Sequence, residues 1–359
     1  MRIASTAVAL LFVACASSQP AATTTTESAA TSTTSTLVAT TTTTAATTTS
    51  STAAESTTTR SPESLVVEVF PVPPGSRPHD VAPAADGGVW YTAQGSGDLG
   101  WLNPETGETL HIPLGEGSRP HGVIVDEEGT PWVTDGGLNA IVEVDPSSHD
   151  VTIYHLPDTS GDVNLNTAVF ADDGFLWFTG QEGVVARMDP GDGEMVVFPA
   201  PGGSGPYGIT VTPDGDVFYA SLAGSYVGEV TVEGEFTVHQ PPTADQGARR
   251  VWTDSLSRVW VSEWNSGNVS RLDPATGSWA TWELPGDAAT YAVFVDDQDI
   301  VWLSDFGTNA LVRFDPTTES FTSYPLPHNP GEVRQIHGRP GEVWGAESAA
   351  DHLVLIRTR

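Results

Sequence analysis

One short pattern recurs seven times along the C-terminal part of this 359-residue chain. Each copy has an apolar strand, a turn of the Asp-Gly or Glu-Gly type, and an aromatic residue followed by small hydroxylated residues. A period of about 42 residues built from strands and turns is typical of a β-propeller. The sequence therefore predicts an all-β fold, a seven-bladed β-propeller of four-stranded blades, with a ligand site at the mouth of its central channel. The marker aromatics are Trp90, Trp132, Trp177, Phe218, Trp260, Trp302 and Trp344, and subtraction gives spacings of 42, 45, 41, 42, 42 and 42.

The second copy shows the expected course of one blade. His121–Val125 is predicted as the innermost strand, Pro131–Asp135 as the second, Ala140–Val144 as the third and Val151–Leu156 as the outer strand. An Asp-Pro pair, Asp145-Pro146, follows the third strand and is a turn signal.

The last copy, from Val333 to Arg359, has room for only three strands. Val66–Phe70 has the composition of an outer strand, and we expect it to complete this blade. An N-terminal strand joined to the C-terminal blade closes the ring and removes two free sheet edges. Residues 63–359 are thus predicted to form one propeller domain, and we expect a monomer.

The charge of the chain excludes some partners. It has 46 acidic residues against 14 basic ones, no lysine, and a formal net charge of -32. Such a charge argues against nucleic acid or an anionic membrane surface as a partner. The acidity favours a role in solubility, with cation binding as the alternative.

Residues 1–15 are predicted to form a lipoprotein-type signal peptide. Arg2 precedes a short apolar run that ends in Phe12-Val13-Ala14-Cys15, which resembles a bacterial lipobox. The run is too short to span a bilayer. We therefore expect an exported, cell-surface lipoprotein whose only membrane contact is a lipid on Cys15, with a secreted form as the alternative.

Residues 16–62 are predicted to form a disordered stalk. They are rich in Thr, Ser and Ala and contain no aromatic residue. Such a segment cannot bury enough apolar surface to offset the entropy lost on ordering it.

Two positions of the repeat are predicted to border the mouth of the channel and to be accessible to solvent. An alternative is that these residues cap strands and pair among themselves, Arg249 with Glu263 for example. A position needed only for packing would repeat one small or aliphatic residue, whereas the first position is polar or aromatic in six of seven copies. The first position, eleven residues before each marker, holds His79, His121, Asn166, Tyr207, Arg249, Tyr291 and Val333. The second, three residues after each marker, holds Ala93, Asp135, Gly180, Ser221, Glu263, Asp305 and Glu347.

The carboxylates at the second position predict a site for an oxygen-binding ion. Mg²⁺ is expected, with Ca²⁺ as the alternative, because both ions prefer carboxylate ligands. The chain has no closely spaced Cys and His cluster, so its sequence does not predict zinc. Arg250 and Arg334 are neighbouring candidates, and we expect them to be structural. The four expected metal ligands are Asp135, Glu263, Asp305 and Glu347, and the expected substrate-binding residues are Asn166, Tyr207, Arg249 and Tyr291.

The repeat resembles the virginiamycin B lyase (streptogramin lyase) family of seven-bladed propellers. Pro206-Tyr-Gly-Ile-Thr210, Trp177-Phe-Thr179 and Asn268-Val-Ser-Arg-Leu272 are close copies of the blade motifs of that family. A sharper match is the pair of consecutive blades that open with Pro78-His79 and Pro120-His121.

The resemblance implies a carbon–oxygen lyase that opens a cyclic ester or depsipeptide by elimination. In the family the first such histidine contacts the substrate, the second is the general base, and nearby carboxylates hold Mg²⁺. Carried over, His79 orients the substrate, His121 takes the proton and Asp135 is an acid at the metal. The chain departs from the family at Arg119, where the family has an acidic metal ligand, and in placing this blade pair after the ring closure.

This chemistry is physically reasonable, and two other functions stay open. Elimination needs a base of near-neutral pKa beside the proton α to a carbonyl, and a divalent cation or Arg249 can stabilise the enolate-like charge. The first alternative is a noncatalytic extracytoplasmic ligand-binding propeller lipoprotein. The second is a metal-dependent lactonase. In each case the partner is a small-molecule or cyclic peptide ligand.

Overall fold

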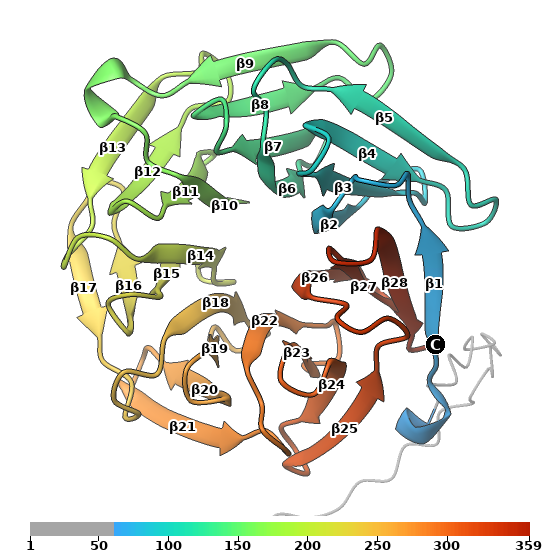
Figure 1. Ribbon diagram of the computed structural model, residues 1–359. Coiled ribbons are helices and arrows are strands. Elements are labelled where there is room, and N and C mark those ends of the chain that lie inside the picture. Colours follow the sequence, from blue (N-terminus) through green and yellow to red (C-terminus); the bar gives the residue numbers. More distant parts are fainter. Residues whose placement is uncertain (1–60) are drawn as a thin grey trace, which may run out of the picture. The chain divides into compact units, whose positions relative to one another are not determined.

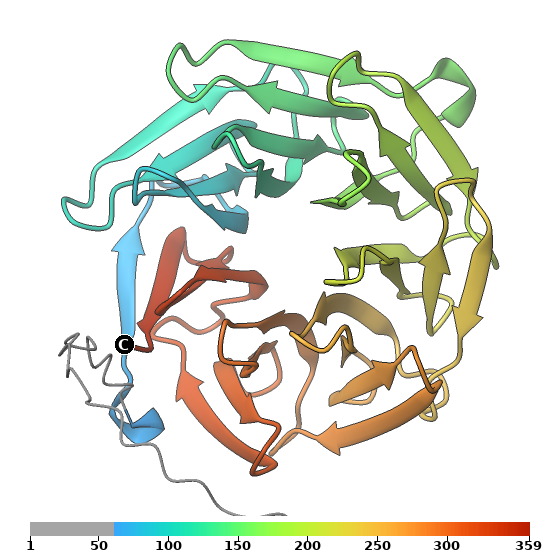
Figure 2. The same ribbon diagram turned by 180° about the vertical axis from the view of Figure 1, so that it is seen from behind.

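The computed structural model describes residues 61–359. The signal peptide, Cys15 and nearly all of the expected stalk lie outside the described residues, so these expectations stay predictions. The described chain forms seven four-stranded sheets arranged as blades around a central channel (Figures 1 and 2). The all-β, seven-bladed propeller predicted from the repeat is confirmed.

Within each blade the four strands run antiparallel from the channel outward. The innermost strands are β2 (Pro78–Pro83), β6 (Pro120–Val125), β10 (Leu165–Phe170), β14 (Pro206–Val211), β18 (Ala248–Thr253), β22 (Thr290–Val295) and β26 (Val333–Arg339). The second strands are β3 (Val89–Ala93), β7 (Pro131–Asp135), β11 (Leu176–Gly180), β15 (Val217–Ser221), β19 (Val259–Glu263), β23 (Val301–Asp305) and β27 (Glu342–Glu347). The third strands are β4 (Asp98–Leu102), β8 (Ala140–Val144), β12 (Val184–Met188), β16 (Tyr226–Val230), β20 (Asn268–Asp273), β24 (Ala310–Asp315) and β28 (His352–Arg357). The outer strands are β1 (Val67–Pro71), β5 (Thr109–Pro113), β9 (Val151–His155), β13 (Met195–Pro199), β17 (Phe236–His239), β21 (Ser278–Glu283) and β25 (Ser320–Pro325).

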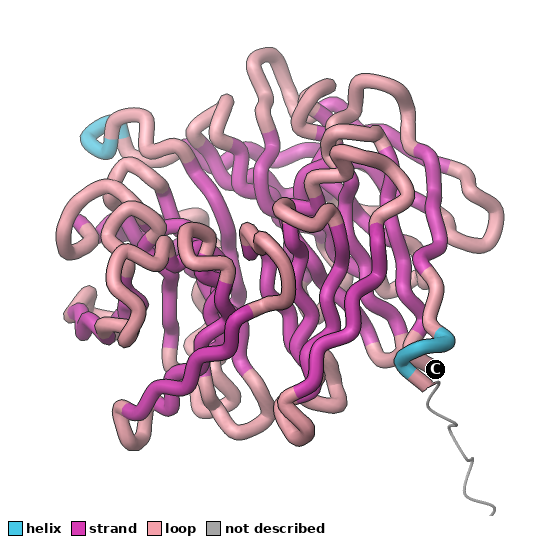
Figure 3. Tube along the Cα trace, turned by 60° about the horizontal axis from the view of Figure 1, so that its bottom comes forward, coloured by secondary structure: helices cyan, strands magenta, loops and turns pink. Residues whose placement is uncertain are grey.

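Helical structure in residues 61–359 is limited to two 3₁₀ turns, η1 (Pro62–Ser64) and η2 (Asp158–Ser160), which Figure 3 shows beside the strands. No helix of this part of the chain is long and apolar enough to cross a membrane.

The ring closes through strands from both ends of the described chain. Strand β1 pairs antiparallel with β28, from Val67 opposite Ile356 to Pro71 opposite His352. It is therefore the outer strand of the blade formed by β26, β27 and β28. The ring of Phe70 packs on that of Trp344 with centroids 5.4 Å apart. Each innermost strand also contacts the innermost strands of both neighbouring blades, so that β26 meets β2.

The marker tryptophans are buried, and the indoles of Trp132, Trp177, Trp260 and Trp302 donate to an aspartate of the turn that precedes them. The indole Nε1 atoms of Trp260 and Trp302 donate to Asp254 and Asp296, both at 2.8 Å. A buried indole needs an acceptor, because an unpaired buried N–H is destabilising. The repeated turn acid supplies it, which explains why acid and aromatic recur together.

Each innermost strand has a register shift against its neighbour near its entry. In the first and fifth blades two consecutive residues at the shift, His79 with Asp80 and Arg249 with Arg250, make contacts across the channel. In the first blade Thr92, two residues after the marker Trp90, lies at the register shift, where the backbone pairing of β2 with β3 is interrupted. Its Oγ1 accepts a hydrogen bond from the Asp80 N–H at 2.9 Å and donates one to the His121 carbonyl of the next blade at 2.9 Å. Thr134 makes the corresponding bonds to the Gly122 N–H and to the backbone carbonyl of Asn166. The hydroxylated residues of the repeat thus join adjacent blades and fix the backbone beneath the channel residues.

Candidate functional site

The structure brings the polar residues at the strand entries together across the channel, but it buries most of them. His79 is 4% exposed to solvent, His121 is 8% exposed and Asn166 is fully buried. The expectation that these residues are freely accessible at the mouth is wrong for this set. The cause is the size of the side chains, which pack against one another at the entry end of the channel.

Two histidines from adjacent blades form the centre of this cluster. The ring centroids of His79 and His121 lie 4.0 Å apart. His79 donates from Nδ1 to Oδ1 of Asp80 at 2.7 Å, which leaves its Nε2 for other partners. The Nε2 atom of His121 lies 3.2 Å from the amide nitrogen of Asn166, whereas its Nδ1 is buried without a hydrogen-bond partner. A buried polar atom without a partner is rare in folded proteins and often marks a functional position.

An arginine from the opposite side of the ring holds this centre. Arg250, which is 4% exposed, donates to Oδ1 of Asp80 at 3.0 Å and also to the hydroxyl of Thr167. Thr167 in turn donates to Oδ1 of Asn166 at 2.8 Å. The network therefore connects strands β2, β6, β10 and β18 across the channel.

The environment of the histidines keeps them neutral near pH 7. Burial lowers the pKa of His79 well below its ordinary value, and the guanidinium of Arg250 lowers it further. Burial also lowers the pKa of His121 well below that value, with a further contribution from His79. Both imidazoles are therefore available as proton acceptors at neutral pH.

A second group at the channel entry consists of arginine and aromatic rings. The guanidinium of Arg249 lies 3.6 Å from the ring centroid of Tyr291 and 4.7 Å from that of Trp264, and it donates to the Tyr207 hydroxyl at 3.1 Å. The hydroxyls of Tyr207 and Tyr291 are 2.6 Å apart. Among the described residues Arg249 has no carboxylate within ion-pair distance, although acids outnumber bases in this chain. It is thus a cation free to meet an anionic or carbonyl group of a ligand.

The charges of this group shift the pKa values of the two tyrosines in opposite directions. Burial raises the pKa of Tyr207 to about 12, and Tyr291 adds to the shift. Burial alone would raise the pKa of Tyr291 as well, but Arg249, Arg250, Arg334 and the hydrogen bond from Tyr207 outweigh it and lower the pKa. Arg334 lies 5.8 Å from the ring centroid of Tyr291, so it belongs to this group, and its guanidinium also donates to Glu332.

The four carboxylates expected to bind a metal do not come together. The Asp135 carboxylate accepts from the backbone of Arg119, Gly137 and Leu138 and from the hydroxyl of Ser118. Asp305 binds the backbone of Ala289 and Gly307 in the same way. These two residues hold the turns of their own blades.

The other two carboxylates also have local partners. Glu263 accepts from the hydroxyls of Ser266 and Ser270. Glu347 accepts from Nδ1 of His328 at 2.7 Å. Within residues 61–359, Asp135, Glu263 and Asp305 belong to no group of three or more His, Cys, Asp or Glu residues with converging ligand atoms. Arg249 and Glu263, the pair given as an example of the alternative to a ligand site, do not form an ion pair.

The residues around the histidine pair fit Mg²⁺ poorly. His79, Asp80 and His121 do converge, but they offer two nitrogens and one carboxylate, whereas Mg²⁺ requires oxygen ligands. Asp80 is already bonded to Arg250, whose positive charge opposes a second cation. The Mg²⁺ expectation therefore finds no oxygen-rich site at the histidines.

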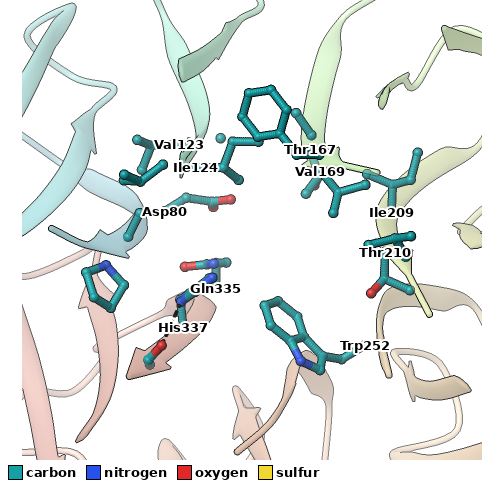
Figure 4. Close-up of a pocket in the computed structure, with 18 of the residues that line it drawn as sticks. Asp80, Val123, Ile124, Thr167, Val169, Ile209, Thr210, Trp252, Gln335 and His337 are labelled. Atoms are coloured by element: carbon teal, nitrogen blue, oxygen red, sulfur yellow. Dashed lines mark hydrogen bonds between the residues drawn. The ribbon is translucent and has the colours of Figure 1, made fainter. Parts of the chain in front are cut away.

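A cavity of about 440 Å³ occupies the channel beyond this cluster. Figure 4 shows Asp80, Gln335 and His337 at one side of it and Trp252 and Ile209 at another. None of the seven entry residues lines it. The cavity extends along the innermost strands toward their far ends, and Asp80 forms part of both its wall and the histidine cluster.

Sequence reasoning missed Asp80 and Thr167; Arg250, expected to be structural, forms the buried ion pair with Asp80. The missing signal is the register shift at the strand entries, because it exposes two consecutive residues to the channel where a regular strand exposes one. In the first blade the pair is His79 and Asp80, and in the fifth it is Arg249 and Arg250.

The sequence matches the model of the virginiamycin B lyase family over residues 23–290 and 128–359. No curated protein matches the sequence significantly.

Several solved structures share the fold. Virginiamycin B lyase from Staphylococcus aureus superimposes with a TM-score of 0.76 at 18% identity, over 82% of this chain and 99% of that one. A catalytically inactive variant of the same enzyme with quinupristin gives 0.76 at 19% identity, over 82% and 99%. The extracellular domain of a putative hybrid two-component system from B. thetaiotaomicron gives 0.66 at 15% identity, over 82% of this chain and 43% of that one. At these identities the likeness establishes the fold, which is used both by an enzyme and by the extracellular domain of a putative two-component system.

Proposed function

Because the chain belongs to the virginiamycin B lyase family, we propose that its channel entry carries out the ring-opening elimination of a cyclic ester or depsipeptide. The observation that supports this most is the buried pair of neutral histidines from adjacent blades, His79 and His121, 4.0 Å apart. Arg249 and Arg334 lie at the same entry, where they can meet a carbonyl or carboxylate group.

In the proposed reaction His121 accepts the proton α to a carbonyl of the substrate at Nδ1, its ring atom without a partner. This requires the tautomer protonated on Nε2, with Asn166 turned so that its amide oxygen accepts from that atom. The Asn166 amide nitrogen then donates to the Thr167 hydroxyl, which reverses the direction of that hydrogen bond and keeps the network connected. The electron pair of the broken C–H bond forms a carbon–carbon double bond. The bond between the β-carbon and the ester oxygen breaks, and the ester leaves as a carboxylate.

The remaining residues stabilise the charges that develop. Arg249 is placed to bind the enolate-like oxygen or the departing carboxylate, because its guanidinium has no acidic partner. Asp80 lies close enough to the histidines to favour the protonated form of His121, as its effect on the pKa of that residue indicates. His79, oriented by Asp80, positions the substrate. No step depends on Mg²⁺.

The test is steady-state kinetics on a cyclic depsipeptide such as quinupristin, with His121→Ala and His79→Ala compared. We expect His121→Ala to lower kcat by ~10²–10⁴-fold, as for loss of a general base. His79→Ala should raise KM more than it lowers kcat. If the two effects are exchanged, His79 with Asp80 is the base; if neither variant changes turnover, the chain is better explained as a ligand-binding propeller.

A further inference from the structure

A second cluster of histidine and carboxylate groups lies in the blade that closes the ring. His328 lies in the loop between β25 and β26, Glu347 ends β27 and His352 begins β28. One ligand atom from each of these three residues lies within 4.8 Å of the others. We refer to these residues as the closure cluster.

Strand pairing places two members of the closure cluster side by side. Glu347 and His352 are directly opposite each other in the antiparallel pair β27 and β28, so their side chains emerge on the same face. Asn309 positions the third member, because its side chain donates to the His328 carbonyl at 2.7 Å and accepts from the Gly331 N–H at 2.8 Å.

The carboxylate at the centre of this cluster lacks part of its hydrogen bonding. Glu347 is fully buried, and its Oε2 accepts from Nδ1 of His328 at 2.7 Å. Its Oε1 is buried and has no hydrogen-bond partner among residues 61–359. Burying an incompletely satisfied carboxylate is destabilising unless a further donor or a cation compensates it.

The second histidine is arranged as a ligand. His352 donates from Nδ1 to the Ala350 carbonyl at 2.6 Å, which leaves Nε2 with its lone pair. A backbone carbonyl on one ring nitrogen commonly orients a histidine whose other nitrogen binds a metal. The rings of His328 and His352 lie with centroids 4.2 Å apart and planes inclined by 25°, and the His328 side chain is 37% exposed. An ion can therefore reach the cluster from solvent.

We propose that His328, Glu347 and His352 bind a divalent transition metal ion. Zn²⁺ is the ion that this ligand set fits, with water as a fourth ligand. Two imidazole nitrogens and one carboxylate form a ligand set that suits Zn²⁺, whereas Mg²⁺ and Ca²⁺ prefer oxygen alone. Binding displaces the proton that His328 now shares with Glu347. The site differs from the oxygen-ligand site expected from the sequence, of which only Glu347 is a member.

The position of the closure cluster gives the ion a structural consequence. His352 lies opposite Pro71 of β1 as well as opposite Glu347 of β27. An ion held there would link a loop and two strands of the blade that joins both ends of the ring. Zn²⁺ should therefore raise the thermal stability of the propeller, independently of any activity in the channel.

The test is thermal unfolding of the full chain, stripped with chelator and then titrated with Zn²⁺ or Mg²⁺. Zn²⁺ at about 100 times its Kd is expected to raise the Tm by a few °C with about one equivalent bound, while Mg²⁺ at the same concentration has no effect. His328→Ala and His352→Ala should abolish the shift. Glu347→Gln, which keeps an acceptor for His328 and removes the charge, should weaken Zn²⁺ binding at least tenfold.

Two controls separate this site from other histidines. His239→Ala removes a histidine that pairs with one carboxylate, Glu229, at 2.9 Å and belongs to no group of three ligands among the described residues. His121→Ala removes one histidine of the pair in the channel. Both variants should keep the Zn²⁺ shift. Circular dichroism at 20 °C verifies that each variant is folded, and Co²⁺ absorption reports ligation directly in any variant of altered stability. A shift that survives in both His328→Ala and His352→Ala, or no shift and no Co²⁺ spectrum in the parent protein, would overturn the proposal.

Discussion

Asp80 and Arg250 form a buried ion pair across the channel, with the Arg250 guanidinium nitrogen 3.0 Å from Oδ1 of the carboxylate. Their side chains are 2% and 5% exposed, and the residues belong to the first and fifth blades of the ring. The pair holds His79 on one side and, through Thr167 and Asn166, His121 on the other. The geometry of the histidine pair thus depends on residues from four blades.

Removing one partner of this ion pair should cost more than removing both. Arg250→Met leaves the Asp80 carboxylate buried without its counter-charge, and such losses amount to about 3–5 kcal/mol. In the double variant Asp80→Asn, Arg250→Met the buried charge is absent, so the protein should be more stable than the Arg250→Met protein. Denaturant unfolding of the parent protein, the two single variants Asp80→Asn and Arg250→Met, and the double variant gives the coupling free energy of the pair. Equal loss in the single and double variants would show that the pair adds nothing.

The histidine pair should contribute to folding as well as to chemistry. His79→Ala leaves Asp80 without one of its hydrogen bonds in a buried place, which typically costs about 1–3 kcal/mol. Exposed His155, in the outer strand β9, offers a comparison in which His155→Ala should change the unfolding free energy by less than about 0.5 kcal/mol. A cost as small for His79→Ala as for His155→Ala would contradict the burial of the pair.

Stability should fall as the pH drops below about 6.5, in part through His337. Burial lowers the pKa of this histidine from 6.5 to about 4, so the folded state binds its proton less readily than the unfolded state. Its contribution is complete above pH 6.5 and is lost as the pH falls toward 4. His337→Gln should therefore flatten the stability profile in that interval by ~1–3 kcal/mol, with the smaller value favoured because the ring lines the channel cavity. Urea unfolding at pH 7 and pH 4.5 measures how much the unfolding free energy of each protein changes between the two pH values. An equal change in the parent protein and in His337→Gln would refute this prediction.

The strand β1 should be essential to the ring. Deletion through residue 74 removes all of β1, its pairing with β28 and the contact of Phe70 with Trp344, and it leaves the outer edge of β28 unpaired. Deletion through residue 61 removes none of these. The longer deletion should lower the Tm by many degrees or give insoluble protein, whereas the shorter one should leave the Tm unchanged. Equal Tm values for both truncated proteins would contradict this closure.

The fold could be predicted from sequence because each repeat encodes its own blade. The turn acid that precedes Trp302 and the small hydroxylated residue that follows it, Ser304, both have bonds that explain their recurrence. Local patterns of this kind report on contacts within a blade and with the next one.

The site could be predicted only in part, because it depends on contacts between distant blades. The position eleven residues before each marker does lead to the channel, and it identified His79, His121 and Arg249. It could not show that Asp80 faces Arg250, since that depends on a register shift and on the ring geometry. The position three residues after the marker misled for Asp135, whose oxygens bind the turns of its own blade.

The closure cluster shows the same limit. The repeat predicts Glu347 as a metal ligand because it lies three residues after a marker aromatic. His328 and His352 occupy neither of the two repeat positions, so the sequence pattern does not indicate them as ligands. Strand register and a loop clamp bring them together.

The mass of the product formed from a cyclic depsipeptide tests the proposed lyase function most directly. Incubation with quinupristin, followed by liquid chromatography and mass spectrometry, should give an open-chain product of unchanged mass, because elimination only moves a proton and breaks one carbon–oxygen bond. His121→Ala should form this product at least ~10²-fold more slowly. A product heavier by one water would instead identify a lactonase. Binding without any product, from a protein that is folded and pure, would contradict the enzyme and leave a ligand-binding propeller.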